Sequence, residues 1–134
     1  MKFSAHFSDA EFRCKCCESL PDEAAPLGGI SPRLIQALEE LRKKLGNKPL
    51  TITPHGGYRC KKENARVKDR AKKSQHILGR ASDVVHEDWL PYEIAEVAET
   101  ILEFKQGGIG LYNDYTHVDV RGCYGQKSAR WKGK

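Results

Sequence analysis

Apolar residues recur along residues 31–46 with the spacing of a helix that buries one face. The spacing is four, three and four residues, which places these side chains on one side of a helix; they are Leu34, Leu38, Leu41 and Leu45. Ser31 is a typical N-cap residue, Pro32 suits the first helical position, and Gly46 suits the end. The pattern predicts a helix over residues 32–45.

A second helical pattern begins at Pro91 and stops at Gly107 and Gly108. We expect its buried face to consist of Ile94, Val97, Ala98, Ile101 and Leu102. Two shorter helical signals precede it. In SDAEF, Ser8 and Glu11 stand at the spacing of a capping box, and residues 61–67 predict one or two helical turns.

Four segments have the pattern of strands, namely residues 49–54, 81–85, 108–112 and 116–121. The last two flank the turn signal NDY, which predicts an antiparallel hairpin. Strands and helices are mixed without a regular βαβα alternation. We therefore predict one α+β domain over residues 1–134, an antiparallel sheet with helices packed on one side.

Composition and charge restrict the classes of protein. The chain has 134 residues, 39% of them hydrophobic and 31% charged, with a net charge of +5. Such a balance is typical of a soluble globular domain and favours polyanionic surroundings, either nucleic acid or an anionic cell wall. The basic residues are scattered, apart from a predicted solvated loop over residues 66–74 and the tail from residue 127. We infer no nucleic-acid site from them.

No segment reaches the length of about 20 apolar residues that spans a bilayer, so we expect no membrane insertion. The opening MKFSAHFSDAEF also lacks the apolar run of a signal peptide. Export would then use another route, as in a phage or prophage lysin, or a leader has been removed.

Five cysteines leave two alternatives open; they are Cys14, Cys16, Cys17, Cys60 and Cys123. One alternative is one or two disulfides that tie the N-terminal arm to the body, with an odd thiol left over. The other is a second, structural zinc site, because clustered thiolates are the usual ligands there.

Three polar residues can converge on one metal ion. His76 and Asp83 are seven residues apart in SQHILGRASDVV, which is too far on a continuous helix, so the chain must turn between them, and Gly79 allows that turn. Asp83 and His117 meet if their two strands are neighbours. Two imidazoles and one carboxylate are a typical catalytic zinc set. The alternative is that both histidines are unrelated polar residues on a sheet.

Two further residues favour catalysis. Asp114 lies three residues before His117 in the predicted hairpin turn, where a carboxylate can take a proton from an attacking water. Arg59 follows the two glycines of HGGYRC. A peptide hydrolase needs such a positive charge for an oxyanion or a substrate carboxylate.

These segments resemble the M15 family of zinc D-Ala-D-Ala carboxypeptidases and peptidoglycan endopeptidases. SQHILGRASDVV is similar to the family motif SxHxxGxAxD, and GIGLYNDYTHVDVRG resembles its block GxGxY followed by HxDxR. GYRC with Asn64 resembles its arginine block. FSDAEFRCKCC is similar to the opening of one branch of the family, and ARW at residues 129–131 to its close.

The resemblance implies a hedgehog/DD-peptidase-like fold and a role for each matching residue. Zinc would be bound by His76, Asp83 and His117. Asp114 would be the general base, and Arg59 would stabilise the tetrahedral intermediate. Ser74 and Gln75 would line the substrate side, and we interpret Asp119 as orienting a ligand histidine.

The remaining histidines depart from the pattern or lack support. His55 stands where a serine-glycine turn is expected; it is either a substrate contact or an incidental loop residue, and we favour the latter. His6 and His86 are expected on the surface.

The leading hypothesis is a zinc-dependent, monomeric peptidase that acts on peptidoglycan peptides at the cell wall. The alternative is a module of the same fold that binds zinc and the cell wall without catalysis. A nucleic-acid binder with a zinc knuckle is disfavoured, because no histidine follows the cysteines at knuckle spacing. Whether the enzyme trims a terminal D-alanine or cuts within the stem or cross-bridge stays open.

Overall fold

A mixed five-stranded sheet forms the centre of the described chain. The structure, a computed structural model, describes residues 1–46, 48–66 and 74–133. The strands are β1 (Thr51–Ile52), β2 (Ala81–Val85), β3 (Gly108–Leu111), β4 (Thr116–Asp119) and β5 (Ala129–Lys132), in the order β1-β2-β4-β3-β5. The first four pair antiparallel, as predicted. Strand β5 was not predicted and pairs parallel to β3.

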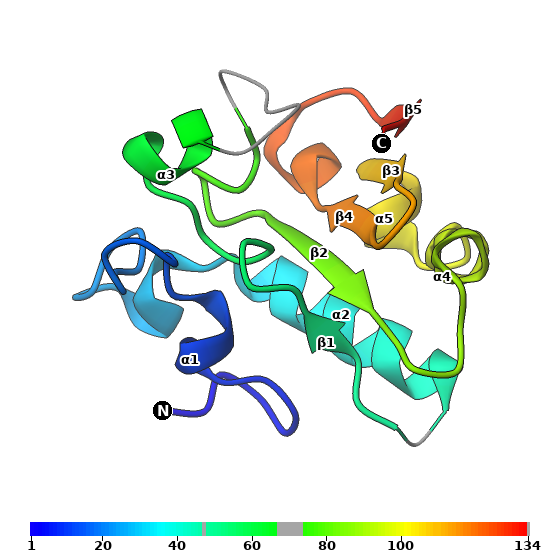
Figure 1. Ribbon diagram of the computed structural model, residues 1–134, viewed down its shortest axis with the longest axis horizontal. Coiled ribbons are helices and arrows are strands. Elements are labelled where there is room, and N and C mark those ends of the chain that lie inside the picture. The colour runs from blue at the N-terminus through cyan, green and yellow to red at the C-terminus, as the bar shows by residue number, and fades with distance from the viewer. Residues whose placement is uncertain (47, 67–73, 134) are drawn as a thin grey trace.

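Helices cover one face of this sheet, which confirms the α+β prediction. They are α2 (Pro32–Leu45), α4 (Pro91–Ala98) and α5 (Leu102–Lys105). In Figure 1, α2 passes behind β1 and β2, and α5 lies behind β3 and β4. The fully buried Val84 and Val118 belong to the hydrophobic core that these helices complete.

Helix α2 forms as its sequence predicts. The Ser31 hydroxyl accepts a hydrogen bond from the Leu34 amide at 3.3 Å, and Pro32 occupies the first helical position. Gly46 ends the helix with a φ of 111°, a value that glycine tolerates better than other residues. All four predicted leucines are buried. Each stabilises the fold by about 1.5–3 kcal/mol relative to an exposed leucine.

The second predicted helix is interrupted. Ile101 is extended, with φ −104° and ψ 119°, so α4 ends at Ala98 and α5 restarts at Leu102. The restart shifts the helical phase, so the prediction that Leu102 is buried is wrong. Leu102 is 61% exposed, and Phe104 of α5 is fully buried.

Shorter elements complete the chain. Helix α1 (Asp9–Phe12) has the predicted capping contact, with the Ser8 amide donating to Glu11 at 2.7 Å. Helix α3 (Lys61–Arg66) follows the loop after β1, and 3-10 turns η1 (Pro26–Gly29) and η2 (Arg121–Tyr124) precede α2 and β5. The predicted basic loop falls mostly at residues 67–73, outside the described residues. Within the described part, no helix is long and apolar enough to cross a membrane.

Candidate metal centre

Two strands bring Asp83 and His117 together. In the antiparallel pairing of β2 with β4, these residues are direct partners. Their side chains lie on the sheet face opposite Val84 and Val118, because neighbouring residues on a strand point to opposite faces. Asp83 Oδ1 is 3.1 Å from His117 Nδ1, and both side chains are buried.

A turn before β2 brings His76 to the same place. Gly79 has a φ of 70°, and its amide donates to the His76 carbonyl at 3.3 Å. A Cβ at this glycine would lie only 2.9 Å from the Gly29 carbonyl oxygen, so both the conformation and the space require glycine. His76 Nε2 consequently lies 3.2 Å from Asp83 Oδ1.

Hydrogen bonds hold both imidazoles in the form that binds a metal. His76 Nδ1 donates to the Gly57 carbonyl at 2.9 Å, so the lone pair is on Nε2. His117 Nε2 donates to Asp119 at 2.7 Å, so the neutral ring has its lone pair on Nδ1. Both lone pairs face Asp83, and His76 Nε2 is buried without a hydrogen bond in the described part of the chain.

This donor set fits a metal cation. Two lone pairs that face one carboxylate repel it unless a positive charge lies among them. Ligand atoms of His76, Asp83 and His117 lie within 4.8 Å of one another. Two imidazole nitrogens and one carboxylate oxygen are a set that zinc accepts. These three residues could therefore hold a metal ion.

The buried charges are consistent with an ionised Asp83. Burial by itself would raise the pKa of Asp83, but the facing His76 and His117, when they carry protons toward it, outweigh burial and hold the pKa well below its usual range, and a bound cation would supply the same positive charge. Burial lowers the pKa of His76, which keeps that ring neutral as a ligand must be. The pKa of His117 is raised, because Asp119 and Asp83 outweigh its burial, so a metal that binds at Nδ1 must displace a proton there.

Asp119 accepts a hydrogen bond from Nε2 of His117, the ring nitrogen that does not face Asp83. It is fully buried and accepts hydrogen bonds from the Gly108 amide at 2.8 Å and from the Arg121 side chain at 2.8 Å. Burial opposes its charge, but His117 and Arg121 together lower its pKa. This geometry suits the predicted role of Asp119 in orienting a ligand histidine.

Arg59 also reaches the centre. Arg59 is 5% exposed, and its Nη2 lies 3.1 Å from Asp83 Oδ2, whereas both histidines contact Oδ1. Nη1 donates to Asn64 at 3.2 Å and Nε to the His55 carbonyl at 2.9 Å. The predicted positive charge is thus beside the carboxylate, which it holds in place.

Trp131 on β5 is a neighbour of the centre that the sequence did not identify as one. Its ring centroid is 4.9 Å from that of His117. A Cβ on Gly110, its β3 partner, would lie 2.5 Å from the indole, so only glycine leaves room. The alternating glycines of GIG were the signal in the sequence that large side chains pack against this face of β3. Gly108 likewise leaves room for the Asp119 carboxylate.

Asp114 is not in direct contact with the three candidate ligands. It is exposed in the turn between β3 and β4, and no hydrogen bond or ion pair within residues 1–46, 48–66 and 74–133 joins it to them. The turn itself is well defined, because Tyr112 and Tyr115 stack at 4.4 Å across it. Tyr112 also accepts a hydrogen bond from Trp131 at 2.9 Å. The role of Asp114 stays a prediction.

Ser74 and Gln75 are buried beside His76 and help to form its turn. The Ser74 hydroxyl accepts from the His76 amide at 3.2 Å, and Gln75 Nε2 donates to Gln126 at 2.6 Å. Gln75 Oε1 has no hydrogen-bond partner in the described chain. Their predicted contact with substrate remains a prediction.

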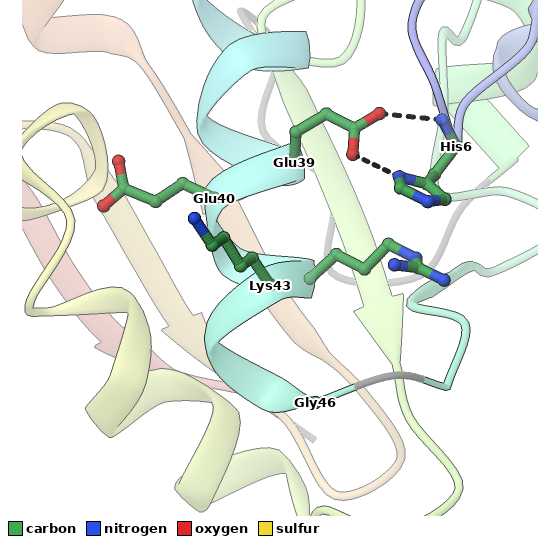
Figure 2. Close-up of a pocket in the computed structure, with 6 residues that line it drawn as sticks. His6, Glu39, Glu40, Lys43 and Gly46 are labelled. Carbon is green, nitrogen blue, oxygen red and sulfur yellow. Dashed lines mark hydrogen bonds and ion pairs between the residues drawn. The ribbon is translucent and has the colours of Figure 1, made fainter.

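The other histidines lie apart from the three candidate ligands. His55 is exposed and pairs with Glu63 at 2.5 Å. The expectation that His86 is on the surface is wrong: it is 7% exposed, because it pairs with Trp89 in a β-bridge and its ring accepts from the Asp88 amide. His6 is exposed as expected, and Figure 2 shows it facing Glu39 of α2 at the edge of a pocket of about 430 Å³.

Comparison with known proteins agrees with the motifs. The family model for Peptidase M15 matches residues 5–119, which include the three candidate ligands and the arginine block. No curated protein matches the chain. Peptidases of this family depend on a metal, and the chain has a donor set that could hold one. On this match over most of its length, the chain belongs to the peptidase M15 family.

Proposed function

We propose that this peptidase is a zinc enzyme that hydrolyses D-amino-acid-containing peptide bonds of peptidoglycan. The observation that carries the proposal is the convergence of two imidazole lone pairs on buried Asp83. Zinc would be held by His76 Nε2, His117 Nδ1 and Asp83, which leaves a coordination position for water or substrate. When bound, zinc supplies Lewis-acid chemistry, which lowers the pKa of water and polarises a peptide carbonyl.

The residues around the centre then have distinct roles. Asp114 takes a proton from the attacking water and passes it to the leaving amine. Arg59 orients Asp83 through their 3.1 Å contact, and its charge stabilises the oxyanion as the carbonyl carbon becomes tetrahedral. Asp119 holds His117 in the tautomer that presents Nδ1. Ser74 and Gln75 border the substrate.

The substrate class rests on the motifs and the charge. The blocks around His76 and His117 resemble those of M15 enzymes that act on D-Ala-D-Ala and on peptidoglycan cross-links. The net charge of +5 favours an anionic cell wall over a neutral surface. We infer that the protein acts at the cell wall as a monomer.

The exposed position of Asp114 is the observation that favours a second candidate. If Asp114 does not reach the attacking water, the same fold would bind zinc and the cell wall without cleaving it. The two candidates differ in turnover, since both predict zinc and both predict muropeptide binding.

Mass spectrometry of purified muropeptides separates the candidates. The zinc-loaded protein should convert intact muropeptides, with His117→Ala as the inactive control. Loss of one alanine identifies a D,D-carboxypeptidase, and cleavage into two peptides identifies an endopeptidase. Binding without any product would establish the non-catalytic module and overturn the proposed activity.

A further inference from the structure

Four cysteines gather at a second place, separate from the histidine centre. We call Cys14, Cys16, Cys17 and Cys60 the cysteine cluster. Their four sulfur atoms all lie within 4.8 Å of one another. Cys14 and Cys16 Sγ are 3.7 Å apart, and Cys16 and Cys60 Sγ are 3.4 Å apart. All five cysteines of the chain are free thiols, and Cys123 does not belong to the cluster.

These spacings match a metal–thiolate tetrahedron. A zinc–sulfur distance of about 2.3 Å places the sulfurs of a tetrahedral site about 3.8 Å apart, whereas bonded sulfurs are about 2.05 Å apart. The distances in the cysteine cluster are close to the first value. We propose that the cysteine cluster binds a second zinc ion, with all four thiolates as ligands.

The backbone is already folded to present these sulfurs. After α1 the chain curls into a tight turn, in which the Cys14 amide donates to the Ser19 carbonyl and the Glu18 amide to the Cys14 carbonyl, both at 2.8 Å. Glu18 adopts a φ of 56° to close it. The turn brings Cys16 and Cys17 to the side of Cys14.

Backbone amides also point at two of the sulfurs. The Cys60 amide donates to Cys14 Sγ at 3.5 Å, and the Glu63 amide donates to Cys60 Sγ at 3.3 Å. Such bonds favour the thiolate, the form that binds metal. Four thiolates and one Zn²⁺ carry a net charge of −2, and the exposed Lys15, Lys61 and Lys62 flank the cysteines in the sequence.

Four protein ligands fill a tetrahedron, so this zinc is structural and leaves no position for substrate. The position of the cysteine cluster indicates which segments this zinc would join. Cys60 follows Arg59 directly, and the Tyr58 amide donates to the Phe12 carbonyl at 2.8 Å. The second zinc therefore fastens the N-terminal arm to the loop that carries Arg59 and the Gly57 carbonyl, the acceptor for His76.

Metal analysis of the full chain tests the proposal. Protein purified under reducing conditions without chelator should contain two zinc ions. The double variant His76→Ala/His117→Ala should keep one, with only sulfur neighbours at about 2.3 Å in X-ray absorption. Cys16→Ser/Cys60→Ser should lose the other, and the matched control Cys123→Ser should lose none.

Two results would overturn it. One is an intact mass under non-reducing conditions that shows disulfides within the cysteine cluster. The other is a zinc-free His76→Ala/His117→Ala variant whose cluster thiols all react at once with a thiol reagent. Neither measurement alters a cysteine, so both remain informative if the cysteine variants fail to fold.

Discussion

Asp83 and His117 face each other across neighbouring strands, with 3.1 Å between Oδ1 and Nδ1, although 34 residues separate them in the sequence. Direct partners in an antiparallel pair have their Cβ atoms about 4.5–5.5 Å apart, so two short side chains meet without help from a loop. Two of the three candidate ligands are thus fixed by sheet hydrogen bonds. Only His76 depends on a turn.

His76→Ala and His117→Ala should each remove zinc from the histidine centre. Each variant deletes one of the two nitrogen donors, and the remaining pair of ligands binds zinc weakly. His6→Ala, which changes an exposed histidine on the other side of the core, is the control and should retain full metal. Metal analysis with separate counting of cysteine-bound zinc provides the measurement. Full retention in both variants would refute the ligand assignment.

Asp114→Asn should lower the rate of hydrolysis by about 10²–10⁴ and leave zinc bound. The amide is nearly the same size as the carboxylate but cannot accept the proton of the attacking water, and a barrier higher by about 3–5 kcal/mol corresponds to that loss. Single-turnover kinetics on a muropeptide provide the measurement, with Asn113→Ala in the same turn as control. A wild-type rate would reduce Asp114 to a turn residue.

Asp119→Asn should weaken zinc binding by about 10–100-fold. The amide removes the charge that accepts the His117 Nε2 proton at 2.7 Å, so the ring loses its fixed orientation. Competition with a chromogenic chelator measures the affinity. Asp88→Asn, an exposed carboxylate beyond β2, is the control. Unchanged affinity in Asp119→Asn would contradict the orienting role.

Gly110→Ala should destabilise the protein by about 1–3 kcal/mol, because its new Cβ would lie 2.5 Å from the Trp131 indole. Trp131→Ala removes that obstacle, so the two substitutions together should cost less than the sum of their separate effects. Urea unfolding of the four proteins in this cycle measures the coupling. Strict additivity would show that Trp131 does not occupy the space above Gly110.

Glu99→Gln should reduce stability slightly at neutral pH and have no effect in acid. Arg130 donates to both Glu99 oxygens, at 2.7 and 2.8 Å, and this pairing lowers the pKa of Glu99 below its ordinary 4.5. The contribution, at most about 1 kcal/mol for so exposed a pair, is present above pH 4.5 and is lost as the pH falls through the lowered pKa. Urea unfolding of both proteins at pH 7 and in acid gives the difference. A difference in unfolding free energy between the two proteins that grew in acid would contradict the stabilising role of the Glu99–Arg130 pair.

Local patterns were enough to predict the long helix, the hairpin and the three candidate ligands. Helix α2 follows from leucine spacing and from Ser31 and Gly46 at its ends, all of which act within a few residues. The ligands followed because strand alternation places Asp83 and His117 on one face once their strands pair, and Gly79 permits the turn back to His76.

Tertiary packing decided what depends on distant partners. The break at Ile101 turns Phe104 into the core in place of Leu102. His86 is buried where the chain forms a β-bridge between His86 and Trp89, a contact that the sequence pattern did not predict. Strand β5 could not be predicted, because it forms only by parallel pairing with β3, which lies 18 or more residues earlier in the chain. That pairing places Trp131 above Gly110.

By itself, the sequence determined which residues could serve as ligands and in which elements they lie, because helix and strand periodicity are set by neighbouring residues. Only the tertiary structure decided which nitrogen of each histidine faces Asp83, since Gly57 and Asp119 select the tautomers from other segments. It also decided that Cys60 meets Cys14, Cys16 and Cys17. Contacts between segments far apart in the chain depend on how the whole core packs, which no local pattern encodes.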